Sequence, residues 1–142
     1  MKVLIDTNVI LDVLTRREPH FESSAAFLKL CGMQVKGFIV ANQTTDVFYL
    51  LRRAGIDAQS TKDIVKKLTD NITVLDITAK DVQNALNAEI GDYEDSLLAC
   101  RAKRQKADYI VTRNEKDFNL SEVPALSPQA FIKQFFSGIG KR

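Results

Sequence analysis

The chain has 142 residues, of which 45% are hydrophobic and 27% are charged, and this composition favours a single domain over residues 1–142 with one hydrophobic core. The formal net charge of +2 is too small to indicate a nucleic-acid-binding protein by itself. No apolar run reaches membrane-spanning length and no secretory signal is visible, so we expect a cytoplasmic protein without a membrane partner.

Apolar runs and helical periodicity predict strands and helices in alternation along the chain. The first strand comprises Val3, Leu4 and Ile5 and ends at Asp6, because strands covered on both faces are continuously apolar. Later strands are predicted at 37–40, 72–77 and 108–112, with a short one at 125–126. Apolar residues at helical spacing predict helices at 8–15, 20–31, 47–54, 64–68, 82–90, 95–106 and 130–136. Only the tail at 137–142 is expected to fray.

Strands separated by helices imply an α/β fold, a three-layer α/β/α domain with a central parallel sheet. In such sheets the active groups lie at the carboxyl ends of the strands. This rule places Asp6 at the mouth of a site, together with Thr112 to Asn114 after the strand at 108–112. A carboxylate in that position needs a partner, because burying a charge is costly unless the charge is paired.

Further acids are expected at the same edge of the sheet. Asp46 lies near the start of the helix after the second strand, "GDYEDSLLA" contains Asp92 and Asp95 at a helix start, and Asp117 follows the strand at 108–112. A single acid there is usually a helix cap or a solvated residue, and this reading stays open for Asp92. Several converging carboxylates repel one another unless they are neutralised, and a hard divalent cation would neutralise them. Oxygen ligands favour Mg²⁺ or Mn²⁺ over zinc.

The residues that most often indicate zinc binding or a histidine base are scarce. Cys31 and Cys100 lie far apart and lack CxxC spacing, so we expect two core thiols and neither a disulfide nor a zinc site. The only histidine is His20 in "REPHFE", and we expect it at a loop or helix start, outside the catalytic centre.

Four segments in the same order resemble the PIN-domain ribonucleases, including the toxin components of VapBC systems. These segments are "LIDTNVILD", an acid about forty residues later, "DYEDSLLA" and "DYIVTRNEKDF". The resemblance covers nearly the whole chain and implies a PIN-like fold. It implies a catalytic set of carboxylates at the carboxyl edge of the sheet: Asp6, Asp46, Asp95 and Asp117.

The resemblance also implies individual roles for these residues. Asp6 and Asp95 match the primary metal-binding acids, and Asp117, or Asn114 beside it, matches the last polar position of the family. Asp46 matches an acid that is Glu in many relatives, and because Asp46 is one methylene shorter we expect it to bind through water. Asp92, Asn114 and Thr112 are expected as auxiliary residues, whereas Glu94 is left out of the site. Thr7 and Asn8 are read either as helix caps or as substrate contacts.

The implied activity is that of an endoribonuclease dependent on Mg²⁺ or Mn²⁺. A bound cation lowers the pKa of its water and polarises a phosphoryl oxygen, and hydrolysis like that of the family leaves a 5′-phosphate and a 3′-hydroxyl. The implied partners are an RNA substrate, an antitoxin protein and a second copy of the chain. An antitoxin would insert a basic side chain into the acidic pocket.

Charge patterning gives weaker information about the substrate. If the four catalytic acids bind metal, the rest of the chain has twenty basic and fourteen acidic side chains, a balance that suits a phosphate backbone. The candidate contacts are the basic residues at 52–53, 62–67 and 101–106, although such runs are more often solvated helix faces. No run that interleaves basic and aromatic residues indicates stacking of single-stranded bases.

A receiver-like signalling domain is the alternative from another class. It also alternates strands and helices and has acids after its first and third strands, where Asp76 could match. The match fails because Asp6 has no adjacent second acid and "ALSP" lacks the expected lysine. A haloacid-dehalogenase-like phosphatase also needs a second Asp, which "DTN" lacks, and no Gly-rich phosphate loop is present. A catalytically silent scaffold with the PIN fold stays open.

Large apolar side chains predict a homodimer. The helix with Phe48, Tyr49 and Leu51, and the segment "AFIKQFF", carry more of these side chains than one helical face can bury. A two-fold dimer would place two acidic pockets on one assembly. The alternative is that all of these side chains fill one core.

Overall fold

The computed structural model describes residues 1–136, and the tail at 137–142 that was expected to fray lies outside the described residues. The strands are β1 (Lys2–Ile5), β2 (Lys36–Val40), β3 (Thr73–Leu75), β4 (Tyr109–Val111) and β5 (Ala125–Leu126). The helices are α1 (Thr7–Leu14), α2 (Phe21–Leu30), α3 (Ala41–Arg53), α4 (Ala58–Asn71), α5 (Ala79–Asn87), α6 (Tyr93–Gln105) and α7 (Pro128–Phe136), with a short 3-10 helix, η1 (Glu115–Phe118).

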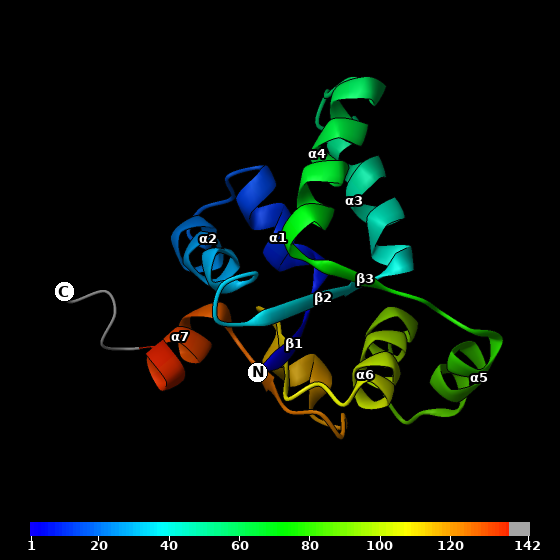
Figure 1. Ribbon diagram of the computed structural model, residues 1–142. Coiled ribbons are helices and arrows are strands. Elements are labelled where there is room, and N and C mark those ends of the chain that lie inside the picture. The colour runs from blue at the N-terminus through cyan, green and yellow to red at the C-terminus, as the bar shows by residue number, and fades with distance from the viewer. Residues whose placement is uncertain (137–142) are drawn as a thin grey trace.

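The five strands form one parallel sheet in the order β3-β2-β1-β4-β5, with β1 in the centre (Figure 1). Val3 pairs with Gly37 of β2 on one side and with Tyr109 of β4 on the other. The ladder continues past the end of β1, because the Asp6 amide donates a hydrogen bond to the Val111 carbonyl at 2.9 Å. Asp6 therefore lies at the carboxyl edge of the central strand, as predicted.

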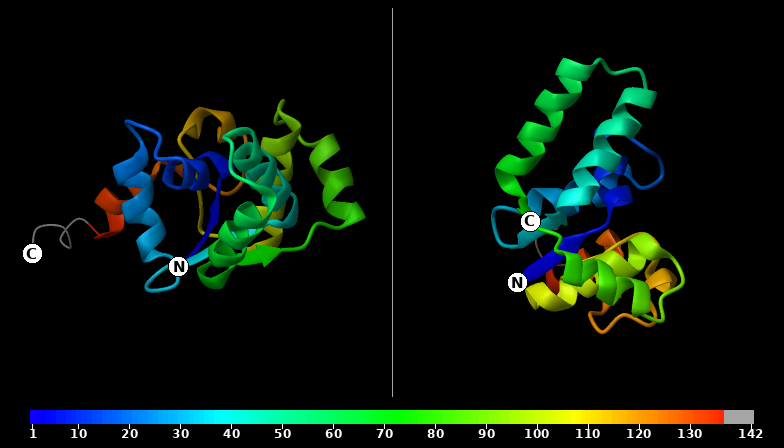
Figure 2. Two further views of the ribbon diagram at one scale, coloured as in Figure 1. Left: turned by 90° about the horizontal axis from the view of Figure 1, so that it is seen from above. Right: turned by 90° about the vertical axis from the view of Figure 1, so that its right-hand side faces the viewer.

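Helices cover both faces of the sheet and make three layers (Figure 2). Val3 and Ile5 point into a core shared with α1, α2, α3 and α7, whereas Leu4 points into a second core shared with α6. All three side chains are buried, and each contributes about 1.5–3 kcal/mol by leaving water. The three-layer α/β/α fold predicted from the alternating pattern is confirmed. No helix within residues 1–136 has the length and apolarity to cross a membrane.

Helices α3 and α4 form a hairpin that stands to one side of the sheet (Figure 1). Val47 and Leu51 of α3 are fully buried and join the larger core. The turn uses Gly55 at φ +95°, a conformation that side chains disfavour. Asp57 then caps α4 by accepting a hydrogen bond from the Ser60 amide at 2.9 Å. Because Val47 and Leu51 pack α3 against the core, the opposite face of this helix is held beside the carboxyl edge of the sheet.

The core takes up most of the apolar side chains that predicted an interface. Phe131 is fully buried and meets the Phe27 ring edge-on, with 5.3 Å between ring centroids. Phe135 and Phe136 are half-buried against the same cluster. Tyr49 is 63% exposed and is the main large apolar residue of this set left on the surface. The apolar surplus that predicted a dimer is therefore smaller than the sequence indicated.

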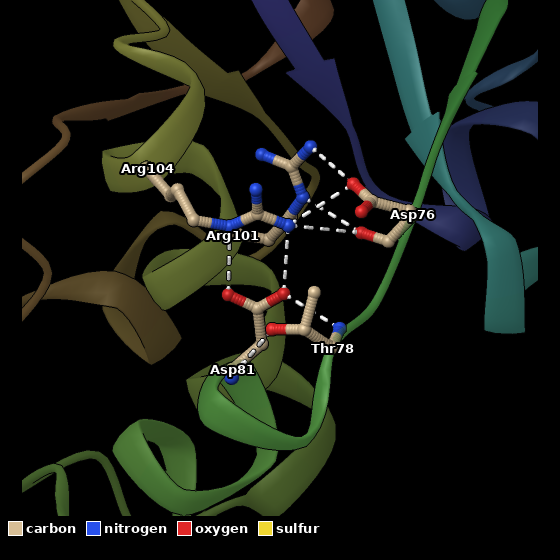
Figure 3. Close-up of polar contacts among 5 residues, drawn as sticks. All are labelled: Asp76, Thr78, Asp81, Arg101 and Arg104. Atoms are coloured by element: carbon tan, nitrogen blue, oxygen red, sulfur yellow. Dashed lines mark hydrogen bonds and ion pairs between the residues drawn. The ribbon is translucent and has the colours of Figure 1, made fainter.

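An ion-pair cluster joins α6 to the segment between β3 and α5 (Figure 3). Arg101 and Arg104 both point toward Asp76, and each guanidinium lies 3.0 Å from its Oδ1 atom. Arg104 also donates to both carboxylate oxygens of Asp81, at 2.9 and 2.8 Å. Asp81 in turn completes a capping box with Thr78. We call this cluster the α6 clamp, because it fixes the helix whose other end carries Asp92 and Asp95.

Both cysteines are free thiols. Cys31 is buried behind β2, and burial raises the pKa of its thiol to about 12. Cys100 is only half-buried and lines a hollow between α5 and α6, so the prediction of a core thiol fits Cys31 better than Cys100. His20 directly precedes α2, as expected for a helix-start residue.

Candidate active site

The carboxyl ends of the central strands open into a pocket of about 430 Å³, which we call the acid pocket. Helices α1, α3 and α6 all begin at its wall. Six of the seven predicted site residues line it: Asp6, Asp46, Asp92, Asp95, Asn114 and Asp117. The seventh, Thr112, is fully buried behind Asp6. The fold therefore brings together residues from four separate parts of the chain.

Thr112 is the direct partner of Asp6. Its hydroxyl donates a hydrogen bond to Asp6 Oδ2 at 2.7 Å, and the Thr112 hydroxyl oxygen itself accepts one from the Asn114 backbone amide at 3.1 Å. Burial raises the pKa of Asp6, and the Thr112 hydrogen bond and the charge of Arg113 oppose that rise. The carboxylate is thus held in one orientation at the floor of the pocket.

Asp12 and Arg113 form a pair beneath the pocket that sequence reasoning missed. Asp12 is fully buried on α1, and its Oδ2 atom lies 3.0 Å from Arg113 Nε. The Ser24 hydroxyl donates to the same oxygen at 3.3 Å. The pair keeps the positive charge of Arg113 close enough to favour ionised Asp6. One signal was available, because Asp12 lies among apolar neighbours on α1 and a buried acid requires a cation.

Gln43 positions α3, and sequence reasoning missed it as well. Its side chain is 1% exposed and accepts a hydrogen bond from the Val40 amide at 2.6 Å. Its amide group donates to the Ile5 carbonyl at 2.7 Å and to the Thr7 hydroxyl at 3.1 Å. Gln43 therefore ties together the ends of β1 and β2 and the start of α3. Asp46 follows one turn later and faces the acid pocket.

The start of α6 supplies the most strongly perturbed carboxyl group of the site. Asp92 caps this helix by accepting a hydrogen bond from the Asp95 amide at 3.0 Å, so its reading as a helix cap is correct although it also lines the pocket. Burial, followed by the charges of Asp92, Asp6, Asp117 and Glu94, raises the pKa of Asp95 to about 6. Burial and uncompensated like charges both disfavour the ionised carboxylate and so act in the same direction.

Glu94, which the sequence analysis left out of the site, lies in the acid pocket opposite Asp46. Burial raises the pKa of Asp46, and the Glu94 carboxyl is within hydrogen-bonding reach of it. Burial and then the charge of Asp46 raise the pKa of Glu94. The sequence held one signal for Glu94, its position next to Asp95. That signal is weak, because consecutive residues on a helix usually point in different directions.

The residues of the acid pocket fit a hard divalent cation. Their donors are carboxylate and amide oxygens, the ligands that Mg²⁺ and Mn²⁺ prefer. The Asn42 Oδ1 atom is buried in the pocket wall and has no hydrogen-bond partner among the described residues. Within residues 1–136 no three acids already converge at coordinating distance. A cation would have to draw them together against the repulsion that, after burial, contributes to the raised pKa of Asp95.

The fold and the acid pocket define an α/β protein with an acidic site at the carboxyl edge of a parallel sheet. The PIN domain family model matches residues 2–116, and the chain belongs to this family. No curated protein matches the sequence.

Three solved structures with similar folds are toxin-antitoxin or VapBC assemblies. A chain of VapBC2 from Rickettsia felis, bound to a DNA fragment from its promoter, has a TM-score of 0.70 at 18% identity, over 89% of this chain and 98% of that one. A chain of VapBC-1 from nontypeable Haemophilus influenzae gives 0.68 at 16% identity, over 91% and 99%. A toxin-antitoxin complex from Klebsiella pneumoniae gives 0.66 at 19% identity, over 89% and 97%. At these identities the likeness establishes a shared fold.

Proposed function

We propose that the protein is an endoribonuclease that hydrolyses RNA phosphodiester bonds with Mg²⁺ or Mn²⁺. The observation that supports this most is the gathering of six carboxyl groups around one pocket, where burial and the neighbouring charges together raise the pKa of Asp95 to about 6. An arrangement in which like charges repel one another is explained if the pocket binds a cation. The chain's membership of the PIN domain family points in the same direction.

Asp6, Asp95 and Asp117 would hold the cation, and Asp46 would contribute through a water molecule. When bound, the cation supplies a water of lowered pKa and neutralises charge on the phosphoryl group. Thr112 holds the Asp6 carboxylate in place. Asp92 fixes the first turn of α6, and with it Asp95. Asn114 is an auxiliary residue at the rim that could orient substrate.

We further propose that the protein is the toxin of a toxin-antitoxin pair. Similar chains were solved as VapBC complexes and as a toxin-antitoxin complex. An antitoxin would place a basic side chain in the acid pocket, where it would meet the same carboxylates as the metal. The receiver-like alternative has lost its second acid, because Asp76 is bound to Arg101 and Arg104 and does not line the pocket.

Cleavage of labelled RNA by the purified protein tests the proposed activity. We expect cleavage with Mg²⁺ or Mn²⁺, none in EDTA, and products with 5′-phosphates. Asp6→Asn and Asp95→Asn should each reduce the rate by at least about a hundredfold, because each removes a charge that the cation requires. Asp46→Asn should have a smaller effect.

Asp70→Asn is the matched control, because Asp70 is exposed at the end of α4 and lines none of the pockets described here. It should retain full activity. Cleavage that continues unchanged in EDTA would refute metal dependence. Metal binding without cleavage of any RNA would instead identify a catalytically silent PIN-fold scaffold.

A further inference from the structure

A second hollow adjoins the acid pocket and shares part of its wall. It has a volume of about 420 Å³, and Asp92, Asp95 and Asp117 line both spaces. The acid pocket extends from these residues toward Arg53 at the end of α3. The second hollow extends from them toward Lys116 in η1. The acids thus lie between two open spaces, each with one basic residue in its lining.

One face of α3 forms a continuous stripe along the acid pocket. Asp46, Tyr49 and Arg53 lie at positions i, i+3 and i+7 and all line the pocket. The stripe runs about 10 Å along the helix axis, from an acidic end to a basic end. The Tyr49 side chain is 63% exposed, and the Phe48 ring supports it edge-on at 5.3 Å between centroids. An aromatic surface for stacking is therefore present where the sequence showed none.

Arg53 and Lys116 are the basic residues that line these two spaces, and they differ from several other basic residues of the chain in forming no ion pair. Arg101 and Arg104 belong to the α6 clamp, and Lys103 pairs with Glu122 at 2.6 Å. Within residues 1–136, Arg53 and Lys116 are exposed and form no ion pair. An unpaired cation beside an acidic pocket suits an anion that passes over the pocket.

We propose that a single-stranded RNA segment crosses the acid pocket along the α3 stripe. One base stacks on Tyr49, Arg53 contacts a backbone phosphate on that side, and Lys116 contacts another phosphate in the second hollow. The scissile phosphate then lies over the shared acids. This inference rests on the proposed function and adds a substrate form to it, since stacking on Tyr49 requires a base free of its duplex.

We call this path from Arg53 over the acids to Lys116 the track. Fluorescence anisotropy with a labelled single-stranded RNA tests it, with Ca²⁺ present so that binding is measured separately from cleavage. Tyr49→Ala should weaken binding by about tenfold, and Tyr49→Phe should bind like the wild type. Arg53→Gln and Lys116→Gln should each lower the slope of log affinity against log salt by about 0.7. Duplex RNA of the same sequence should be insensitive to Tyr49→Ala.

Two matched controls lie outside both spaces. Tyr93→Ala removes an exposed aromatic residue beside the acids, and Lys67→Gln removes an exposed charge on α4; both should bind like the wild type. Wild-type affinity in Tyr49→Ala, or an equal loss in Tyr93→Ala, would overturn the track. So would an effect of Tyr49→Ala on subunit association alone, which would mark a protein interface.

Failure of the track and failure of the proposed function have different signatures. If the wild type cleaves RNA but Tyr49→Ala, Arg53→Gln and Lys116→Gln all bind RNA normally, the track is wrong and the nuclease assignment stands. If the wild type binds RNA with the expected sensitivities but never cleaves it, the nuclease assignment is wrong and the track stands. A wild type that neither binds nor cleaves RNA overturns both.

Discussion

Asp95 is a partly buried carboxyl group whose ionisation opposes folding. Burial and four neighbouring acids raise its pKa from an ordinary value of 3.8 to about 6. Between these two pH values the folded protein holds a proton that the unfolded chain has released, so stability falls as pH rises through this window. Asp6, Asp46 and Glu94 have pKa values raised in the same direction. Near neutral pH the metal-free pocket is therefore a strained part of the molecule.

Without metal, the melting temperature should fall as pH rises from about 4 to about 6.5, and Asp95→Asn should flatten this dependence. At pH 7 we expect Asp95→Asn to be more stable by about 1 kcal/mol, or about 3 °C, after allowing for solvent screening. Added Mn²⁺ should raise the melting temperature more at pH 7 than at pH 5, because metal and proton compete for the same oxygens. Calorimetry across pH measures both effects, and a less stable Asp95→Asn at pH 7 would indicate a structural cap instead.

Asp12 makes a different kind of contribution, because its charge is compensated. Asp12→Ala should destabilise the protein by about 3 kcal/mol, since it leaves Arg113 without its partner in a largely buried position. Asp12→Asn keeps the volume and one acceptor and should cost less. Urea unfolding gives both values, and a midpoint shift with an unchanged m value assigns the loss to the folded state. A loss below about 0.5 kcal/mol for Asp12→Ala would contradict a structural role for the pair.

At the scale of elements, the α6 clamp holds the helix that carries Asp92 and Asp95. Arg104→Ala should destabilise the α5 and α6 pair by about 2 kcal/mol near neutral pH, because Asp81 is only 2% exposed and would lose its cation. In the wild type, burial would raise the pKa of Asp81, but the Arg104 and Thr78 hydrogen bonds hold it below its ordinary value. The clamp's contribution is thus present above about pH 4 and is lost on acidification.

Hydrogen exchange in α5 and melting across pH check the Arg104 prediction. The wild type should lose stability as pH falls below about 4, whereas Arg104→Ala should show a smaller acid-induced loss because protonated Asp81 no longer needs a cation. Arg104→Lys keeps the charge but loses the two-pronged contact and should fall between them. An identical pH profile in Arg104→Ala and wild type would show that Asp81 does not depend on Arg104.

The order of the elements could be predicted from apolar patterns, but some boundaries could not. Helix α3 begins at Ala41, well before the apolar residues at 47–54 that predicted it, because its first turns face the acid pocket and carry polar side chains. Ile90 was expected in a helix, but α5 ends at Asn87 and Ile90 packs on the core from the following loop. Hydrophobic periodicity detects faces that meet the core, and it gives no signal for a face that lines a site.

In the candidate site too, some residues could be identified from the sequence and others could not. Asp6 and Asp95 could be identified because strand ends and helix starts are recognisable in a sequence. Gln43 and Arg113 could not, because their partners lie far away along the chain or on another element. Arg101 was a candidate phosphate contact, and the structure instead places it 3.0 Å from Asp76. Only the fold determines which charges are already paired.

For the whole molecule, self-association stays a prediction. We expect a two-fold dimer with two acid pockets, although the exposed apolar surface of α3 is now reduced mainly to Tyr49. Light scattering over a wide concentration range measures the mass directly. A constant mass of 15.9 kDa would rule out the dimer and leave the nuclease proposal intact.

The hydrogen bond between Thr112 and Asp6 joins residues 106 positions apart. During translation, β1 leaves the ribosome first but can gain its neighbour β4 only after residues 109–111 have been made. At about 5–20 residues per second, this delay lasts roughly 5–20 seconds. The carboxylates at the end of β1 and the start of α6 therefore cannot take up their final arrangement on a nascent chain until synthesis is well advanced.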